Sequence, residues 1–264
     1  MPRENTTVWD PAQYGIFGGE RARPFAELVA RLGRTEPARV TDLGCGSGEL
    51  TATLAARWPH AVIDALDGSP EMIAAAREHE IPGRLTFRVG DVTDWEPDRP
   101  VDLIVSNAVL QWIPEHPDLL PRWAGALAPG GRLAFQVPGN FDAPSHAILR
   151  ELGRSDRWRA ELGEFQRDAP VLDPAGYLDL LTRHGYAVDA WETTYAQVLQ
   201  GEDPVLEWVK GTTLRPALSA LDPDETDEFL DTYRERLRRA YPAAPYGTVF
   251  PFRRIFVIAT RDAR

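Results

Sequence analysis

The sequence predicts an α/β fold in which a mostly parallel sheet carries helices on both faces. Apolar runs of strand length alternate with segments of helical periodicity. A glycine-rich turn joins the first of these strands to a helix, and acidic residues follow later strands where such a sheet gathers its ligands. With 264 residues the chain is long enough for one domain with a sizeable core and insertions.

The first half of the chain predicts five strands and the helices between them. The strands are short apolar runs, namely Arg39–Leu43, Ala61–Leu66, Leu85–Val89, Val101–Ser106 and Arg132–Val137. Apolar periodicity and capping residues predict helices at Pro24–Leu32, Glu49–Trp58, from Ser69-Pro70 onward, and at Leu119–Leu127, the last ended by Pro129-Gly130-Gly131.

The second half predicts two further strands with a helical insertion between them. A helix from Asp173 to His184 precedes the strands Ala187–Val198 and Ile255–Thr260. The insertion contains helices at Pro204–Gly211 and Asp222–Arg239. Asp222 is placed to cap the second of these, with Pro223 and Glu225 in supporting positions.

The stretch Thr41 to Gly48 carries three glycines at alternate positions between a strand and a helix. Glycine leaves no Cβ in the way, and the following helix offers unpaired N–H groups to a ligand. The dinucleotide fingerprint requires Gly or Ala where this chain has Glu49, and a carboxylate there faces a pyrophosphate badly. The spacing therefore favours a cofactor without phosphates, for which S-adenosylmethionine with its positive sulfonium is the candidate.

Composition narrows the class of protein. A formal net charge of -11 and a pI near 5.0 argue against nucleic acid as a partner. The single Cys45 excludes an internal disulfide, and a small buried filler is the better interpretation than a nucleophile. No spacing typical of a zinc site, no signal-peptide pattern and no run of membrane-span length occurs, so we expect a cytoplasmic enzyme without metal or membrane partner.

Polar residues at the ends of the later strands point to the same crevice. Asp67 follows the second strand, where a carboxylate can accept hydrogen bonds from both ribose hydroxyls; the alternative is a helix N-cap. Asp91 follows the third strand and is placed to meet an adenine amine. Asn107 follows the fourth strand, and Trp112 lies shortly after it, either at the crevice or as a core aromatic.

In combination, Asp42-Leu43-Gly44-Cys45-Gly46-Ser47-Gly48, Asp67-Gly68-Ser69-Pro70-Glu71-Met72, Gly90-Asp91 and Ala108-Val109-Leu110-Gln111-Trp112 resemble class I S-adenosylmethionine-dependent methyltransferases. The resemblance implies a Rossmann-like, seven-stranded sheet whose last strand is antiparallel and lies between strands five and six. It also implies a set of cofactor-binding residues: Asp42, Gly44, Gly46, Gly48, Asp67, Gly68, Met72, Asp91, Val92, Asn107 and Trp112. We expect a cap over residues 1–37, a cofactor core over 38–140, and helical insertions at 138–172 and 200–250 that cover the acceptor.

A narrower resemblance runs along nearly the whole chain. Its motifs are Trp9-Asp10-Pro11, Tyr14, Phe17, Glu20-Arg21-Ala22-Arg23-Pro24, Leu110-Gln111-Trp112, Trp191-Glu192-Thr193-Thr194-Tyr195, Leu214-Arg215-Pro216 and Arg254-Ile255-Phe256-Val257-Ile258-Ala259-Thr260-Arg261. These resemble trans-aconitate 2-methyltransferases. The resemblance implies methylation of one carboxylate of trans-aconitate, which gives the monomethyl ester and S-adenosylhomocysteine. Ser47 departs from a proline that is common in that family's glycine loop.

This chemistry needs no catalytic acid or base, because a carboxylate with a pKa near ~4 is already ionised at neutral pH. Binding a small polycarboxylate to an acidic protein instead requires Arg, whose planar fork meets a carboxylate bidentately. The expected acceptor-binding residues lie in the segments that should cover the crevice: Tyr14, Arg23, Gln111, Tyr195, Arg215, Tyr246 and Arg254. Four further arginines, Arg234, Arg236, Arg238 and Arg239, are instead expected on the solvated face of a helix and as favourable charge near its carboxyl end.

Three alternatives stay open from the sequence. One is a related small-molecule methyltransferase that esterifies another free acid. A second is a nicotinamide-dependent oxidoreductase, which Glu49 and the glycine spacing disfavour. The third is a regulatory protein that binds the cofactor without catalysis. A monomer or a weak homodimer is expected in each case.

Overall fold

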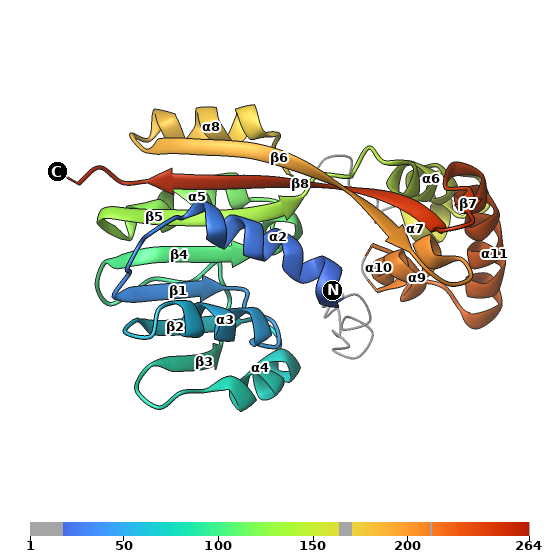
Figure 1. The fold of residues 1–264 in the computed structure, drawn as a ribbon. Coiled ribbons are helices and arrows are strands. Elements are labelled where there is room, and N and C mark those ends of the chain that lie inside the picture. The colour runs from blue at the N-terminus through green and yellow to red at the C-terminus, as the bar shows by residue number, and fades with distance from the viewer. Residues whose placement is uncertain (1–17, 164–170, 212, 264) are drawn as a thin grey trace. The chain divides into compact units, whose positions relative to one another are not determined.

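A computed structural model describes residues 18–163, 171–211 and 213–263 of the chain, and these form two compact units (Figure 1). The core unit contains residues 18–138, 171–193 and 254–263 of the described part, and the helical unit contains residues 139–163, 194–211 and 213–253. The covering role expected for the insertions at 138–172 and 200–250 stays a prediction.

The core unit is built on a mostly parallel sheet with the order β3-β2-β1-β4-β5-β8-β6 (Figure 1). The strands of this sheet are β1 (Arg39–Leu43), β2 (Val62–Asp67), β3 (Leu85–Val89), β4 (Val101–Asn107), β5 (Leu127–Pro138), β6 (Ala187–Leu199) and β8 (Gly247–Thr260). The residues of β6 after 193 and of β8 before 254 belong to the helical unit. Strands β1 to β5 pair in parallel, and β8 runs antiparallel to β5 and lies between β5 and β6. The predicted class I topology is therefore confirmed.

Two strands are longer than the sequence predicts. β5 begins at Leu127 rather than Arg132, because Leu127 already pairs with Val101 of β4. The register then shifts, so that the Pro-Gly-Gly residues are accommodated before Arg132 pairs with Leu103. β8 begins at Gly247 rather than Ile255, and Pro251 within it hides the strand from a hydrophobicity pattern. A two-residue strand, β7 (Ala243–Ala244), pairs with the start of β8 and makes the sheet eight-stranded rather than seven-stranded.

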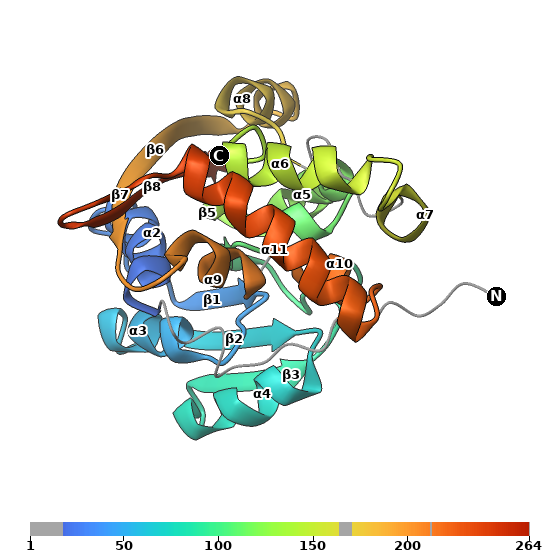
Figure 2. The same ribbon diagram turned by 90° about the vertical axis from the view of Figure 1, so that its right-hand side faces the viewer.

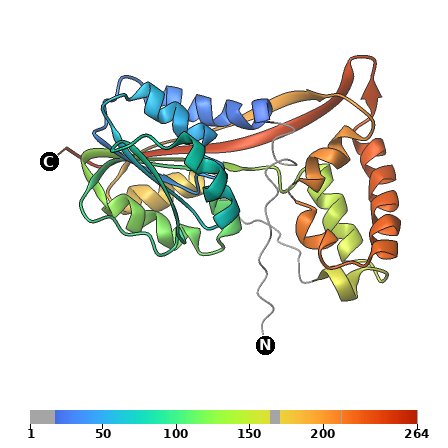
Figure 3. The same ribbon diagram turned by 90° about the horizontal axis from the view of Figure 1, so that it is seen from below.

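Helices cover both faces of the sheet in the core unit. Figures 2 and 3 show α2 (Gly18–Arg31) and α3 (Glu49–Arg57) on one face, with α5 (His116–Gly125) and α8 (Pro174–Arg183) on the other. On the α5 side, Trp123, Phe135 and Tyr177 belong to one buried cluster. Burial of large apolar side chains contributes about 1.5–3 kcal/mol each, so this packing stabilises the sheet on that face.

Local capping explains where the crossover helix after β2 begins. Helix α4 (Pro70–Ala76) starts with Pro at its first position, and the Ser69 hydroxyl accepts a hydrogen bond from the Met72 amide at 3.2 Å. Ser69, not Asp67, is therefore the cap of this helix. This leaves the carboxylate of Asp67 for other partners.

The helical unit contains α6 (Pro144–Gly153), α7 (Arg159–Leu162), α9 (Pro204–Lys210), α10 (Arg215–Leu218) and α11 (Pro223–Ala240). Side chains from these helices and the start of β8 share a second buried cluster, which includes Trp158, Trp208, Phe229 and Phe250. The Tyr233 hydroxyl donates to the Ser145 carbonyl at 2.8 Å and joins α11 to α6. The predicted helices of the late insertion are confirmed to within two residues at each end.

Asp222 caps α11 as the sequence predicts, and its removal gives a testable stability change. The Asp222 carboxylate accepts from the Glu225 amide at 2.9 Å, and the Glu225 carboxylate accepts from the Asp222 amide at 3.2 Å. We expect Asp222→Ala to lower the free energy of unfolding by about 1 kcal/mol. Urea denaturation followed by circular dichroism measures this, and Asp222→Ser should recover most of the loss.

Candidate cofactor site and acceptor residues

The glycine loop between β1 and α3 requires glycine for two different reasons. Gly44, Gly46 and Gly48 have φ angles of 85°, 56° and 82°, which side chains rarely adopt. A Cβ on Gly44 would lie 2.1 Å from Cγ2 of Val109, so this glycine allows the loop to approach the segment after β4. A Cβ on Gly46 would meet no atom of the described residues within 4 Å, so these residues leave the space over Gly46 open to a ligand.

Asp42 lies at the bottom of this loop as a buried carboxylate with one atom left for a ligand. It is 2% exposed, and its Oδ2 accepts a 2.6 Å hydrogen bond from the Thr51 hydroxyl of α3. Its Oδ1 is buried and has no hydrogen-bond partner among the described residues. Burial raises the pKa of Asp42 to about 7, against the opposing effect of the Thr51 hydrogen bond. An ammonium group would satisfy the unpaired oxygen and favour the ionised form.

Asp67 joins two backbone turns at the end of β2. Its Oδ2 accepts from the Gly46 amide at 2.9 Å, and its Oδ1 accepts from the Ser69 amide at 2.9 Å. Each oxygen keeps a further lone pair for a ribose hydroxyl. A Cβ on Gly68 would meet no atom of the described residues within 4 Å, and Met72, three residues after Ser69, is buried. These positions agree with the expected ribose site, whose residue roles stay predictions.

At the end of β3 the two predicted residues have different environments. Asp91 is exposed, and its Oδ1 accepts from both the amide and the hydroxyl of Thr93, at 2.8 Å and 2.7 Å. Val92 is buried and belongs to the core cluster on the α5 side. Asp91 thus shapes its own turn in addition to any contact with an adenine.

The segment after β4 is fixed by residues of β4 and β5. Ala108 has a φ of 57°, a left-handed conformation without glycine, and its amide donates to the Gln136 carbonyl at 2.9 Å. The Oδ1 atom of Asn107 accepts a hydrogen bond from Nε2 of the Gln136 side chain. Strained backbone of this kind collects at functional sites, where the surrounding structure holds it. Trp112, by contrast, is exposed and is therefore not a core aromatic.

The predicted acceptor residues fall in both units. In the core unit, Arg23 is exposed on α2, while Arg254 of β8 is 6% exposed and donates from Nη1 to Gln136 Oε1 at 3.2 Å. In the helical unit, Tyr195 is buried, and Tyr246 is 63% exposed at the turn between β7 and β8. Arg215 is the first residue of α10. Tyr14 lies outside the described residues.

Gln111 was predicted to bind the acceptor, and its orientation bears on that role. Its Nε2 donates to the Ala108 carbonyl at 2.6 Å, and its Oε1 is buried without a partner among the described residues. In this orientation the amide offers an acceptor, and an ionised carboxylate has no proton to give it. A contact between Gln111 and an acceptor carboxylate requires the amide to turn over, and the assignment stays a prediction.

The thiol of Cys45 in the glycine loop is not activated as a nucleophile. Cys45 is half-buried rather than fully buried, and burial together with the charges of Asp42 and Asp67 raises the pKa of its thiol. The thiol is thus held in its protonated, weakly nucleophilic form.

Within the described ranges, no group of three or more His, Cys, Asp or Glu residues is arranged to hold a metal ion. No helix in the described part of the chain is long and apolar enough to cross a bilayer.

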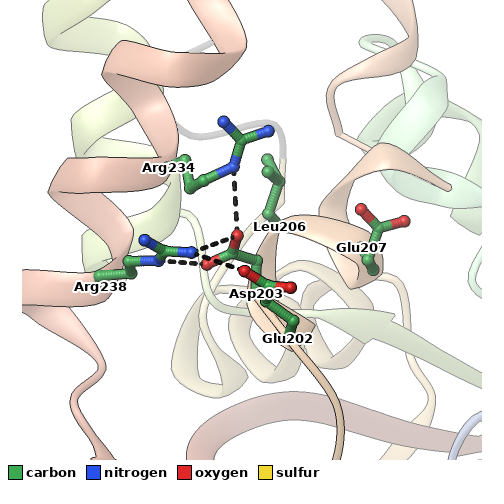
Figure 4. A pocket seen from close by; sticks show the side chains of 6 residues that line it. All are labelled: Glu202, Asp203, Leu206, Glu207, Arg234 and Arg238. Atoms are coloured by element: carbon green, nitrogen blue, oxygen red, sulfur yellow. Dashed lines mark hydrogen bonds and ion pairs between the residues drawn. The ribbon is translucent and has the colours of Figure 1, made fainter.

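An open hollow of about 400 Å³ lies in the helical unit, and its described lining includes no predicted site residue (Figure 4). Glu202, Asp203, Leu206, Glu207, Arg234 and Arg238 line it. Asp203 pairs with Arg234 at 3.1 Å and with Arg238 at 2.5 Å, so both guanidinium groups already have a carboxylate partner. The charged residues that line the hollow therefore form an ion-pair network between the start of α9 and α11. We do not assign an anion-binding site to the hollow.

Two residues of the site were missed by reasoning from the sequence. Thr51 was one polar residue of an amphipathic helix, and only the fold shows that its hydroxyl meets Asp42. Gln136 is a single amide within the apolar run Leu133–Val137, and a polar residue in a buried strand was the available signal.

Comparisons with known proteins identify the family. The model of a methyltransferase domain family matches residues 17–191. Trans-aconitate 2-methyltransferase of Streptomyces avermitilis is 55% identical over 97% of this chain and 97% of its own. The enzyme of the same name from Rhodococcus jostii is 53% identical over 96% of this chain and 99% of its own.

The chain belongs to the trans-aconitate 2-methyltransferase family. It is thus a methyltransferase dependent on S-adenosylmethionine, and the oxidoreductase alternative is not retained. Membership of the family identifies S-adenosylmethionine as the cofactor that the site must accommodate. The unpaired oxygen of Asp42 and the open space over Gly46 fit such a cofactor.

Solved structures agree with this fold at low sequence identity. A Haloferax volcanii chain in complex with the methyltransferase activator Trm112 is 21% identical, with a TM-score of 0.57 over 96% of this chain and 94% of that one. Phosphoethanolamine N-methyltransferase 2 of Haemonchus contortus, solved with S-adenosylhomocysteine, is 17% identical, with a TM-score of 0.55 over 91% of this chain and 52% of that one. At these identities the likeness supports the fold alone.

Proposed function

We propose that this chain transfers the methyl group of S-adenosylmethionine to one carboxylate of trans-aconitate, giving the monomethyl ester and S-adenosylhomocysteine. The observation that carries the proposal is the 55% identity, over nearly the full length, to an enzyme named for this acceptor. The features of the site that support it are a buried Arg254 on β8 and a loop that fits the cofactor.

The reaction asks this chain for alignment rather than proton transfer. S-adenosylmethionine supplies an electrophilic methyl group bound to a sulfonium. A carboxylate oxygen forms the new bond to that methyl as the bond from methyl to sulfur breaks, and no proton moves. Holding the reactants in line can lower such a barrier by about 7–11 kcal/mol. We therefore assign no residue as a general base, and the raised pKa of Cys45, which keeps its thiol protonated, agrees with this.

Arg254 is the strongest candidate to hold the acceptor. It is the predicted acceptor-binding cation that the core unit buries, whereas Arg23 is exposed. A guanidinium in a water-poor position binds a carboxylate more strongly than one at the surface, because the local dielectric is low. Arg215 and the tyrosines Tyr14, Tyr195 and Tyr246 stay proposed contacts for the remaining carboxylates.

Cofactor binding should depend on pH through Asp42. The pKa of this carboxyl is about 7 in the free protein, and an ammonium beside it lowers that pKa in the complex. Binding therefore prefers the ionised carboxylate and releases a proton between the two pKa values. We expect the affinity for S-adenosylhomocysteine to rise from pH 5.5 to about 7 and then to level off. Calorimetry across this range measures it, and Asp42→Asn should bind more weakly with little of the pH dependence.

The acceptor is tested with the purified protein and a panel of acids. We expect methyl ester by mass spectrometry with trans-aconitate, and lower values of kcat/KM with cis-aconitate, citrate and isocitrate. Ester formation on a different free acid alone would favour the related methyltransferase alternative. A protein that binds the cofactor and methylates no acid would instead fit the regulatory alternative.

Further properties accompany this proposal. We place the enzyme in the cytoplasm, with a small polycarboxylate as its partner, and we expect a monomer or a weak homodimer. Size-exclusion chromatography with light scattering, at two protein concentrations, checks the oligomeric state.

A further inference from the structure

Gln136 is a buried polar residue that contacts the strands on both sides of its own. It lies in β5 and is 1% exposed. Its Oε1 accepts from Arg254 of β8 at 3.2 Å, and its Nε2 donates to Asn107 of β4. An amide in a buried strand costs free energy unless it is hydrogen-bonded, and here both ends of the amide are. A chain of hydrogen bonds therefore runs across three neighbouring strands.

The register of the sheet makes this chain possible. Asn107 stands opposite Gln136 in the parallel pair, and Phe256 stands opposite Gln136 in the antiparallel pair. Arg254 is two residues from Phe256 and so emerges on the same face of the sheet, as the diagonal neighbour of Gln136. All three polar side chains consequently share one face.

The backbone of Gln136 holds the turn that follows β4. Its carbonyl accepts from the amide of Ala108, whose φ of 57° costs about 1–2 kcal/mol for a residue with a side chain. One residue thereby fixes the side chain of Asn107 and the strained turn immediately after it. The resemblance to class I methyltransferases includes Asn107, the residue immediately before this turn, among the expected cofactor-binding residues.

We propose that Gln136 is a positioning residue, which holds Arg254 and the Asn107 turn in a fixed relation so that a carboxylate bound by Arg254 is aligned with the methyl donor. This inference rests on the proposed function, and on Arg254 as the acceptor cation. A neutral amide suits the task, because it orients the guanidinium without cancelling its charge as a carboxylate would. A misplacement of about 1 Å in such an alignment can cost about 100-fold in rate.

Two variants of similar size separate charge from orientation. Gln136→Glu keeps the shape and places a carboxylate on Arg254, so we expect the KM for trans-aconitate to rise 10-fold to 100-fold, in line with about 1.4–2.8 kcal/mol. Gln136→Leu removes both hydrogen bonds and keeps the core apolar, so we expect kcat to fall about 10-fold to 100-fold with a smaller change in KM. The Kd for S-adenosylhomocysteine should stay within threefold in both.

A double-mutant cycle tests whether Gln136 acts through Arg254. If it does, Gln136→Leu should cost much less in kcat/KM in an Arg254→Lys background than in the wild-type protein. Additive losses in the double mutant would overturn the inference. So would kinetics within twofold of wild type in the single Gln136 variants. A loss of cofactor affinity and melting temperature in these variants, without a specific change in KM or kcat, would overturn it as well. Should Gln136→Leu fail to fold, Gln136→Glu alone decides by its KM.

The wild-type protein separates this inference from the proposed function. Methylation of trans-aconitate by the wild type with unaltered kinetics in the variants would reject the role of Gln136 and leave the function standing. No methylation by the wild type, in a protein that binds S-adenosylhomocysteine, would reject the function itself.

Discussion

Gly46→Ala should weaken binding of S-adenosylmethionine by about 10-fold to 100-fold, equivalent to about 1.4–2.8 kcal/mol, while leaving the protein folded. The described residues leave the space over Gly46 open, so the new methyl group meets none of their atoms within 4 Å. Its φ of 56° makes the substitution strained by about 1–2 kcal/mol. The loss of affinity beyond that strain would come from the methyl group entering the space of the cofactor. Calorimetry with S-adenosylhomocysteine measures the affinity.

Matched controls separate strain from occlusion. Gly33 and Gly83 also have positive φ angles, of 66° and 73°, and open space at the position of a Cβ. Alanine at either position should lower the melting temperature as much as Gly46→Ala and leave cofactor affinity unchanged. Gly44→Ala is a different case, because its Cβ would collide with Val109, and it should lower both stability and affinity. Normal affinity in Gly46→Ala would place the cofactor elsewhere.

Arg254→Met should lower kcat/KM for trans-aconitate by about 100-fold to 1,000-fold, since it removes charged hydrogen bonds of about 1.5–3 kcal/mol each. Arg254→Lys should lose about 10-fold, because it keeps the charge and loses the planar fork. Steady-state kinetics with varied acceptor measures both. Because Arg254 is buried and donates to Gln136, Arg254→Met also leaves an amide oxygen unpaired and should be less stable by about 1–3 kcal/mol.

Cofactor affinity is the internal control for this second result. An Arg254 variant that binds S-adenosylhomocysteine as wild type does is folded around the cofactor, so a loss of acceptor kinetics then belongs to the acceptor. Arg183→Met is a matched surface control, because this arginine pairs with Asp179 on the exposed side of α8. A fall in cofactor affinity with unchanged acceptor KM would show that Arg254 serves the cofactor instead.

The fold was largely predictable because each local pattern agrees with the others. The glycine turn, the Ser69-Pro70 cap and the alternation of strands with helices each predict the same doubly wound sheet, and the structure confirms it. The errors lie where sequence patterns are ambiguous. A Pro-Gly-Gly sequence within β5 reads as a loop, and Pro251 within β8 reads as a break, yet both strands continue through them.

The site was predictable where it depends on local sequence and not where it depends on register. The strand ends that carry Asp42, Asp67 and Asn107 follow from the order of the elements. The contacts of Gln136 with residues 29 positions before it and 118 positions after it depend on how β4, β5 and β8 pair, which no local pattern encodes. For the same reason, the burial of Arg254 and the exposure of Arg23 emerge only from the structure.

The transfer of a labelled methyl group tests the central claim most directly. Purified protein is incubated with S-adenosylmethionine carrying a ¹³C methyl group and with trans-aconitate, and the products are followed by mass spectrometry and NMR. We predict a single labelled ester methyl on trans-aconitate, formed together with an equal amount of S-adenosylhomocysteine. Intact trans-aconitate after full incubation, with a protein that demonstrably binds S-adenosylhomocysteine, would contradict the proposed function.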